Sequence, residues 1–351
     1  MSRIVPAFGV AMVVGVGAHV PLSGESAGRL TPMARSCIFA RLRRLVVVVP
    51  IAVIVILSWG VGAADASFPG RNGVIAFDLL RSSESGMGEE EGTDRRILMV
   101  NPGSRRLVAS KLCGGPLFGC QENGPAFSAS GRRLAFLHAD APPGGGSDSD
   151  LWPIQLAVSQ ADGSSPRSIE LVGSPAWAPG GKRLLVSGLG LWVVRPDGSG
   201  RQEIRAEGDN GDWSSRNRIA FEDRGKKRPH GIGNFVDIYS VRPDGSDQRR
   251  LTRRETALRP SWSPGGTRLA YIRGLGRRPG LYTMAADGTD KQFIARDAFN
   301  SAWSPDGDRI AFIRGKSLFT IRPDGGGLRL IYRVRAPSVR APLHGLSWQP
   351  L

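Results

Sequence analysis

The chain has 351 residues, three cysteines and a formal net charge of +16, from 47 Lys and Arg against 31 Asp and Glu. A basic chain can attract anionic envelope polymers, lipids or acidic proteins, or it can carry no more than a solvated basic surface. Nucleic acid is disfavoured as a partner, because no basic and aromatic binding motif accompanies the charge.

Residues 41–66 have the pattern of a secretion signal. The positive flank consists of Arg41, Arg43 and Arg44. An apolar stretch follows at 45–57, and Ala-Asp-Ala at 64–66 forms a cleavage site that predicts a mature start at Ser67. The alternative is an uncleaved anchor, since 45–63 approaches the ~20 apolar residues that span a bilayer. Either way we expect an extracytoplasmic protein (secreted, periplasmic or at the cell surface) whose membrane contact is confined to this segment.

The sequence divides into three parts. Residues 1–32 carry a second, weaker apolar stretch, and a translation start at Met33 would place the leader directly before the mature domain. We therefore expect 1–32 to be an extension of uncertain status, 33–66 a signal peptide or anchor, and 67–351 a single domain. That domain keeps a net charge of +12, from 41 basic and 29 acidic residues.

Two cysteines remain after the leader, Cys113 and Cys120, in the sequence Cys-Gly-Gly-Pro-Leu-Phe-Gly-Cys. Close pairs of this kind in exported proteins predict a disulfide. A metal pair is the alternative, but no nearby His or Cys completes a set of four ligands.

From residue 72 onward one pattern recurs: an aromatic-centred strand, a Gly turn, an apolar strand, a gap, and a further strand that ends in Asp-Gly. The aligned aromatic positions are Phe127, Trp177, Trp213, Trp262, Trp303 and Trp348. The aligned Asp-Gly turns begin at Asp162, Asp197, Asp244, Asp287 and Asp324. A repeat of roughly 40–50 residues is the signature of a β-propeller, whose blades have four strands, here named A to D. The recurrence of Trp at one position favours core packing over sugar stacking.

The two ends of the repeat region predict how the ring closes. Residues 72–77 read as a strand B with no strand A before it, and 346–350 read as a strand A with nothing after it. Joined, they complete one blade. No window after residue 66 has a helical apolar period. The expected fold is therefore all-β, a six-bladed β-propeller of four-stranded blades, closed by the C-terminal strand A pairing with the N-terminal strands B–D.

The repeat resembles that of the TolB-like propellers, a WD-like family. The matching motifs are Trp-Ser-Pro-Asp-Gly at 303–307, Ile-Ala-Phe at 310–312 and Asp-Gly at 324–325. The resemblance covers nearly all of 67–351 and is weakest at 127–131 and 213–217. It implies a six-bladed extracytoplasmic propeller that binds proteins or envelope components. A second domain of the kind that precedes the propeller in TolB is not recognisable, so TolB's role in envelope transport is not implied.

Long connections gather on one predicted face of the disc. The B–C loops are 80–95, 138–150, 222–235 and 274–279, and the segment 113–120 is a D–A connection on the same face. Long loops presented together by a rigid scaffold commonly bind partners, so we expect a protein or an anionic envelope component there. The alternative is that the sequence and length of these loops vary without a function, because long surface loops cost little stability.

The residue three positions before each aromatic should ring the mouth of the central channel on that face. These residues are Gly124, Ser174, Asn210, Arg259, Asn300 and Gly345. The ring is small and polar with one cation, and His344 lies beside it. We expect the ligand-binding residues to be Ser174, Asn210, Arg259, Asn300 and His344. The ligand would be a small anion or an acidic peptide end, and the alternative is a channel filled with water.

Motifs for catalysis and cofactors are not found in the sequence. Gly315-Lys-Ser317 lacks the first glycine of a phosphate loop, and no Gly-x-Ser-x-Gly elbow occurs. The acidic run at 89–91 lacks the alternation of a calcium loop. We therefore expect no catalytic residue, no metal and no cofactor, and a monomeric binding platform in the cell envelope. The alternative is a secreted hydrolase or lyase with its site at the channel mouth, which acidic side chains pointing into the channel would favour.

Overall fold

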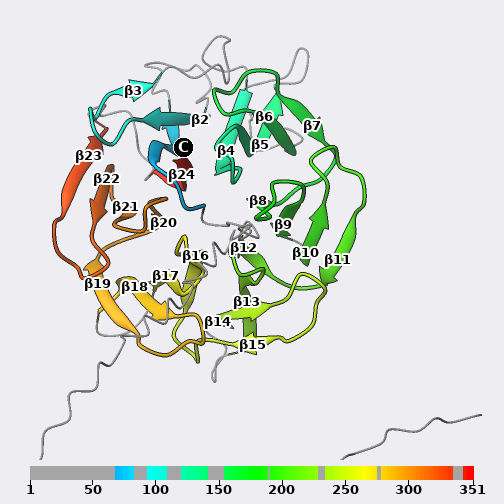
Figure 1. Cartoon of the computed structure of the whole chain (residues 1–351), viewed down its shortest axis with the longest axis vertical. Coiled ribbons are helices and arrows are strands. Elements are labelled where there is room, and N and C mark those ends of the chain that lie inside the picture. The colour runs from blue at the N-terminus through cyan, green and yellow to red at the C-terminus, as the bar shows by residue number, and fades with distance from the viewer. Residues whose placement is uncertain are drawn as a thin grey trace, which may run out of the picture. The chain divides into compact units, whose positions relative to one another are not determined.

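The computed structural model describes residues 68–82, 93–108, 120–140, 154–188, 190–227, 234–274, 278–334 and 343–351, which all belong to one compact unit. Their regular structure is entirely β, with the strands arranged in blades around a central axis (Figure 1). No helix long and apolar enough to cross a membrane occurs within these ranges. The predicted leader lies outside the described residues, as do Cys113 and most of the segment between it and Cys120.

The first blade is built from both ends of the propeller. Its strands, from the axis outward, are β24 (His344–Pro350), β1 (Asn72–Ser82), β2 (Thr93–Val100) and β3 (Leu107–Val108). β24 pairs antiparallel with β1, and Ile75 lies opposite Trp348. This confirms the predicted closure, in which β24 covers the inner edge of β1.

The other five blades each follow the chain from the inside outward. Blade 2 is β4 (Cys120–Phe127), β5 (Arg133–Asp140), β6 (Gln155–Gln160) and β7 (Arg167–Ile169). Blade 3 is β8 (Ser174–Trp177), β9 (Leu184–Gly188), β10 (Gly190–Val194) and β11 (Gln202–Arg205). Blade 4 is β12 (Asp209–Trp213), β13 (Ile219–Lys227), β14 (Asn234–Val241) and β15 (Arg249–Arg250). Blade 5 is β16 (Ala257–Trp262), β17 (Arg268–Arg273), β18 (Gly280–Ala285) and β19 (Gln292–Arg296). Blade 6 is β20 (Ser301–Trp303), β21 (Ile310–Arg314), β22 (Ser317–Ile321) and β23 (Arg329–Arg333). The six predicted blades are thus confirmed.

The repeated tryptophans form the core between blades, as predicted. Trp177, Trp213 and Trp262 are at most 2% exposed. Trp213 packs between residues of blades 3 and 4, among them Leu185 and Phe221. Because each Trp fills the space between its own sheet and that of the preceding blade, replacing one opens a cavity at a blade interface.

Serine and aspartate recur in the turns because their side-chain oxygens accept hydrogen bonds from the backbone amides of the turn. In the A–B turns, the hydroxyl oxygens of Ser214 and Ser263 accept hydrogen bonds from the backbone amides of Arg218 and Arg268, both at 3.0 Å. In the C–D turns, an Asp carboxylate accepts hydrogen bonds from both the amide and the hydroxyl of the residue two positions later, as Asp244 does from Ser246. These side-chain bonds define the tight returns that the sequence pattern predicts.

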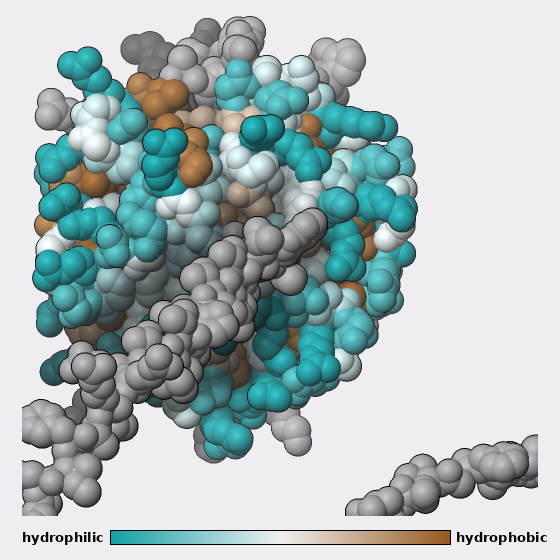
Figure 2. Space-filling model, viewed as in Figure 1, coloured by the Kyte–Doolittle hydropathy of each residue, from teal (hydrophilic) through white to brown (hydrophobic). Residues whose placement is uncertain are grey.

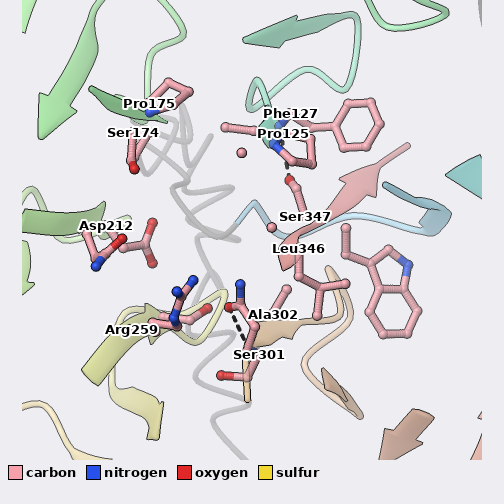
Figure 3. A pocket seen from close by; sticks show the side chains of 18 of the residues that line it. Pro125, Phe127, Ser174, Pro175, Asp212, Arg259, Ser301, Ala302, Leu346 and Ser347 are labelled. Carbon is pink, nitrogen blue, oxygen red and sulfur yellow. Dashed lines mark hydrogen bonds between the residues drawn. The ribbon is translucent and has the colours of Figure 1, made fainter. Parts of the chain in front are cut away.

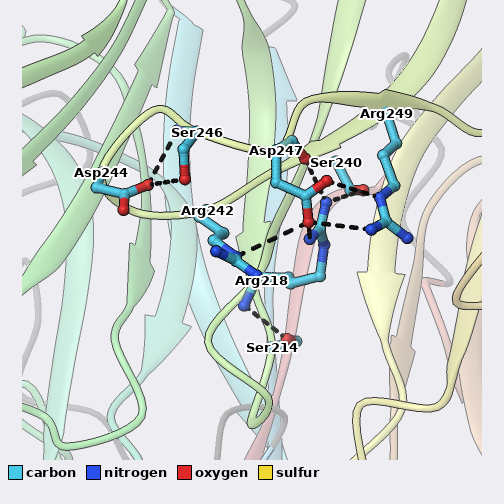
Figure 4. A network of polar contacts seen from close by, with 8 residues as sticks. All are labelled: Ser214, Arg218, Ser240, Arg242, Asp244, Ser246, Asp247 and Arg249. Carbon is cyan, nitrogen blue, oxygen red and sulfur yellow. Dashed lines mark hydrogen bonds and ion pairs between the residues drawn. The ribbon is translucent and has the colours of Figure 1, made fainter. Parts of the chain in front are cut away.

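Part of the high arginine content has a structural role in blade 4 (Figure 4). Arg218 donates to Asp247 Oδ2 at 2.7 Å and to Ser240 Oγ at 2.9 Å, and Arg249 donates to Asp247 Oδ1 at 2.9 Å. Hydrogen bonds from Arg249 and Arg218 lower the pKa of Asp247 to about 2. The space-filling view shows a mainly hydrophilic outer rim with scattered apolar groups (Figure 2). These arginines therefore connect strands to turns through hydrogen bonds, in addition to making the surface basic.

Candidate functional site

A cavity of about 200 Å³ lies on the axis, lined by the strands A of all six blades (Figure 3). All six residues of the predicted ring contribute to its wall: Gly124, Ser174, Asn210, Arg259, Asn300 and Gly345. Ser174, Asp212, Arg259 and Ser301 surround the same central space (Figure 3). The topology therefore brings together residues that are up to 221 positions apart in the sequence.

Four of the six ring residues interrupt the regular strand. Gly124, Asn210, Arg259 and Gly345 have positive φ angles of 63°, 45°, 52° and 24°. The pairing register of β4, β12, β16 and β24 shifts at these residues. Bulges of this kind redirect side chains and recur next to functional sites. Arg259 is unusual, because a long side chain without a local polar group rarely adopts this conformation.

Arg259 is held from two sides. Its amide donates to Glu222 Oε1 at 2.6 Å, and its guanidinium lies over the Phe299 ring at 4.7 Å from the centroid. Across the described ranges, no ion pair to this guanidinium occurs. A guanidinium stacked on an aromatic face keeps its in-plane donors available for an anion.

Two carboxyl groups stand behind the ring in blades 1 and 4, which face each other in a ring of six. Asp78 on β1 is 0% exposed and Glu222 on β13 is 8% exposed. Burial raises the pKa of Asp78 to about 6, against the opposing effects of Arg95, the Gly124 amide and Arg259. Burial also raises the pKa of Glu222 to about 7, helped by Asp209 and opposed by the Arg259 amide and guanidinium.

A third carboxyl, Asp212, belongs to the cavity wall and links two blades. It accepts the Trp213 amide at 3.0 Å and, across to blade 5, the Trp262 amide at 2.6 Å. Burial raises its pKa to about 6 despite these two amides. Ser347 links blades 1 and 2 in the same way, because its hydroxyl accepts a hydrogen bond from the Phe127 amide at 3.0 Å.

These carboxyls were not identified from the sequence, although a signal for two of them exists. Asp78 and Glu222 each follow the phenylalanine of strand B, at the position where blades 5 and 6 have Ile272 and Ile313. A charged residue at a repeat position that is otherwise apolar is a candidate for a functional or paired group. Asp212, by contrast, occupies a repeat position that is otherwise filled by small residues, so its place at the channel follows only from the fold.

The remaining predicted features fall mainly outside the described residues. The His344 backbone pairs with Asp78, but its side chain is outside the described part, as are Cys113 and the Cys120 side chain. The central segments of the long loops, at 83–92, 141–153, 228–233 and 275–277, also lie outside it. Within the described ranges, no group of three His, Cys, Asp or Glu is placed to hold a metal ion.

The glycine at position 345 provides a test of how Asp78 is placed. A Cβ on Gly345 would lie 2.1 Å from Asp78 Oδ1 and 2.7 Å from Pro125 Cδ, whereas a Cβ on Gly124 would meet nothing within 4 Å. Both residues have positive φ, so Gly124→Ala should cost about 1–2 kcal/mol from backbone strain alone. Gly345→Ala should cost a further 1–3 kcal/mol, roughly, from overpacking against Asp78. Urea unfolding of the two variants measures the difference, and equal losses would contradict the placement of Asp78.

Comparison with solved structures identifies the fold. The TolB structure from Acinetobacter baumannii has a TM-score of 0.60 at 13% identity, over 80% of this chain and 67% of that one. A nidogen/laminin complex matches with a TM-score of 0.54 at 12% identity, over 79% of this chain and 98% of that one. The structure of a putative TolB from Agrobacterium tumefaciens matches with a TM-score of 0.50 at 14% identity, over 79% of this chain and 91% of that one. The sequence matches no protein-family model and no curated protein.

Proposed function

We propose that this chain, a TolB-like six-bladed β-propeller, is an extracytoplasmic binding protein that holds an anionic group of its partner at the channel mouth. The observation that carries the proposal is Arg259, the one ring cation, stacked on Phe299 beside a cavity and without an ion pair in the described ranges. The polar ring residues Ser174, Asn210 and Asn300 supply further hydrogen-bonding groups. The signal-like segment at 41–66 supports the location.

The predicted long-loop face would extend this site outward. Except for Gly124, which lies in the middle of β4, the ring residues lie within two positions of the start of their strands A, at the end of the channel to which the D–A connections lead. A partner whose anionic end enters the mouth would therefore meet the B–C loops around it. This arrangement favours a protein or an envelope polymer over a free small molecule, because the loops can add contact area that the cavity alone does not offer.

Sulfate binding tests the anion site directly, because sulfate keeps its charge between pH 5 and 8. We expect titration calorimetry at pH 6 to detect sulfate binding that Arg259→Gln abolishes. Arg296→Gln is the matched control: it removes the same charge from the exposed end of β19 in the same blade and should leave binding unchanged. Equal binding by the Arg259 variant and the native protein would contradict the proposed site.

A second candidate function, a hydrolase or lyase, rests on the buried carboxyls. Groups with pKa values raised toward neutrality, such as Asp78 and Glu222, are the kind that act as general acids or bases. The assay is turnover of nitrophenyl esters, nitrophenyl glycosides and polyuronates by the native protein and by Glu222→Gln. Turnover that the variant loses would favour an enzyme, and we expect none.

A further inference from the structure

We propose that the channel mouth is a proton-linked anion site, which binds its anion more tightly as the solution becomes acidic, because the buried carboxyls Asp78 and Glu222 flank Arg259 from facing blades. This inference rests on the proposed function, since it describes how the same site is regulated. It adds a property that the ring residues alone do not provide.

Glu222 and Asp78 each lie against a ring residue, behind the cavity wall. Glu222 accepts the Arg259 amide at 2.6 Å, so its charge lies next to the residue that would hold the anion. Asp78 stands behind Gly345, and neither of its oxygens has a hydrogen-bond partner of normal geometry among the described residues. Both carboxyls interact electrostatically with Arg259. An anion that enters the cavity would therefore compete with the two buried acids for electrostatic interaction with the Arg259 guanidinium.

The protonation state of these two acids couples pH to anion binding. Their raised pKa values, about 6 and about 7, mean that both groups change charge between pH 5 and 8. When they are ionised, they repel an anion at Arg259 and compete for its charge. When they are neutral, that repulsion is lost. By linkage, a bound anion must in turn favour the protonated acids, so anion binding takes up protons.

Other charged groups on the surrounding strands have to be separated from this effect. They are Arg95 on β2, Glu122 on β4, Asp209 and Asp212 on β12, and His344 on β24. Asp212 lines the cavity, and burial raises its pKa to about 6 although both of its oxygens accept hydrogen bonds from backbone amides, so a pH dependence left in the absence of Asp78 and Glu222 is assigned to it. His344 titrates in the same range when unperturbed, so it needs its own control.

The experiment is sulfate titration of the protein, expressed as the full chain, at pH 5.5, 6.5 and 8. We expect sulfate affinity to fall about tenfold from pH 5.5 to 8, the order expected from one like charge directly behind the cavity wall. At pH 6.5 the binding heat should depend on the ionisation enthalpy of the buffer, which reports proton uptake. In the Asp78→Asn, Glu222→Gln double variant, the affinity should be high and nearly independent of pH. His344→Gln should keep the pH dependence of the native protein.

The outcomes separate this inference from the proposed function. No Arg259-dependent sulfate binding at any pH would overturn the anion site itself. Arg259-dependent binding with constant affinity would leave the anion site standing and overturn the proton linkage. A pH dependence that persists in the double variant would assign it to another group, such as Asp212 or His344, and would also overturn this inference. If the double variant unfolds, each single variant should remove part of the proton uptake.

Discussion

A chain that ends at residue 342 should not fold cooperatively, because it loses the whole of β24. This strand pairs with β1 and buries Trp348, which is 6% exposed, against Ile75 and Phe77 in the core of the closing blade. Removing a buried aromatic typically costs about 3–5 kcal/mol, and losing the strand also opens the inner edge of β1. The combined loss is of the size of a domain's total stability.

Circular dichroism and thermal unfolding measure this loss. We expect the shortened chain to show no cooperative transition and to aggregate through its open sheet edge. The matched control is Leu351→Ala, since this side chain is 62% exposed while its backbone bonds to Arg71 are kept. The control should unfold like the native protein. A shortened chain with a native-like transition would show that the ring does not depend on the composite blade.

Replacing Glu222 by Gln should raise the free energy of unfolding at pH 8 by about 3 kcal/mol. The folded state raises the pKa of this group from 4.5 to about 7, so between these values the folded protein binds more protons than the unfolded chain. Stability from Glu222 is therefore fully present below pH 4.5 and is lost as the pH rises toward 7. Gln keeps the acceptor for the Arg259 amide but carries no charge to desolvate.

Urea unfolding of the variant between pH 4 and 8 measures this effect. We expect the native protein to lose stability across this window and the Glu222→Gln variant to lose less, with the difference complete near pH 8. Glu203→Gln, on the exposed part of β11, is the control for the same change of charge and should not alter the profile. A variant that is less stable than the native protein at pH 8 would show that the ionised Glu222 is stabilised by its surroundings.

The fold could be predicted because its signals are local and repeated. Each Trp, each Asp-Gly turn and each apolar strand recurs in register, and the unpaired ends at 72–77 and 346–350 define the closing blade. The ring residues could also be predicted, because the blade pattern places one residue of every strand A at the mouth. The pattern predicts Arg259 in this way, whereas its stacking on Phe299 depends on the fold.

The acids of the site could not be predicted in the same way, because their role depends on depth and on contacts between blades. Glu222 stands out in the sequence as a charged residue at an otherwise apolar position of strand B, but only the bulge in β16 brings the Arg259 amide to it. Asp212 belongs to the site only because Trp262 comes from the next blade and donates to it. Burial, and therefore the raised pKa, follows from the packing of separate repeats and not from the spacing within one.

The measurement that tests the binding site most directly is a crystal structure of the protein soaked with selenate, whose selenium gives an anomalous signal. We expect an anomalous peak in the channel mouth within hydrogen-bond distance of the Arg259 guanidinium, present at pH 5.5 and absent in the Arg259→Gln variant. Peaks confined to arginines on the outer surface, with none in the mouth, would contradict the proposed anion site.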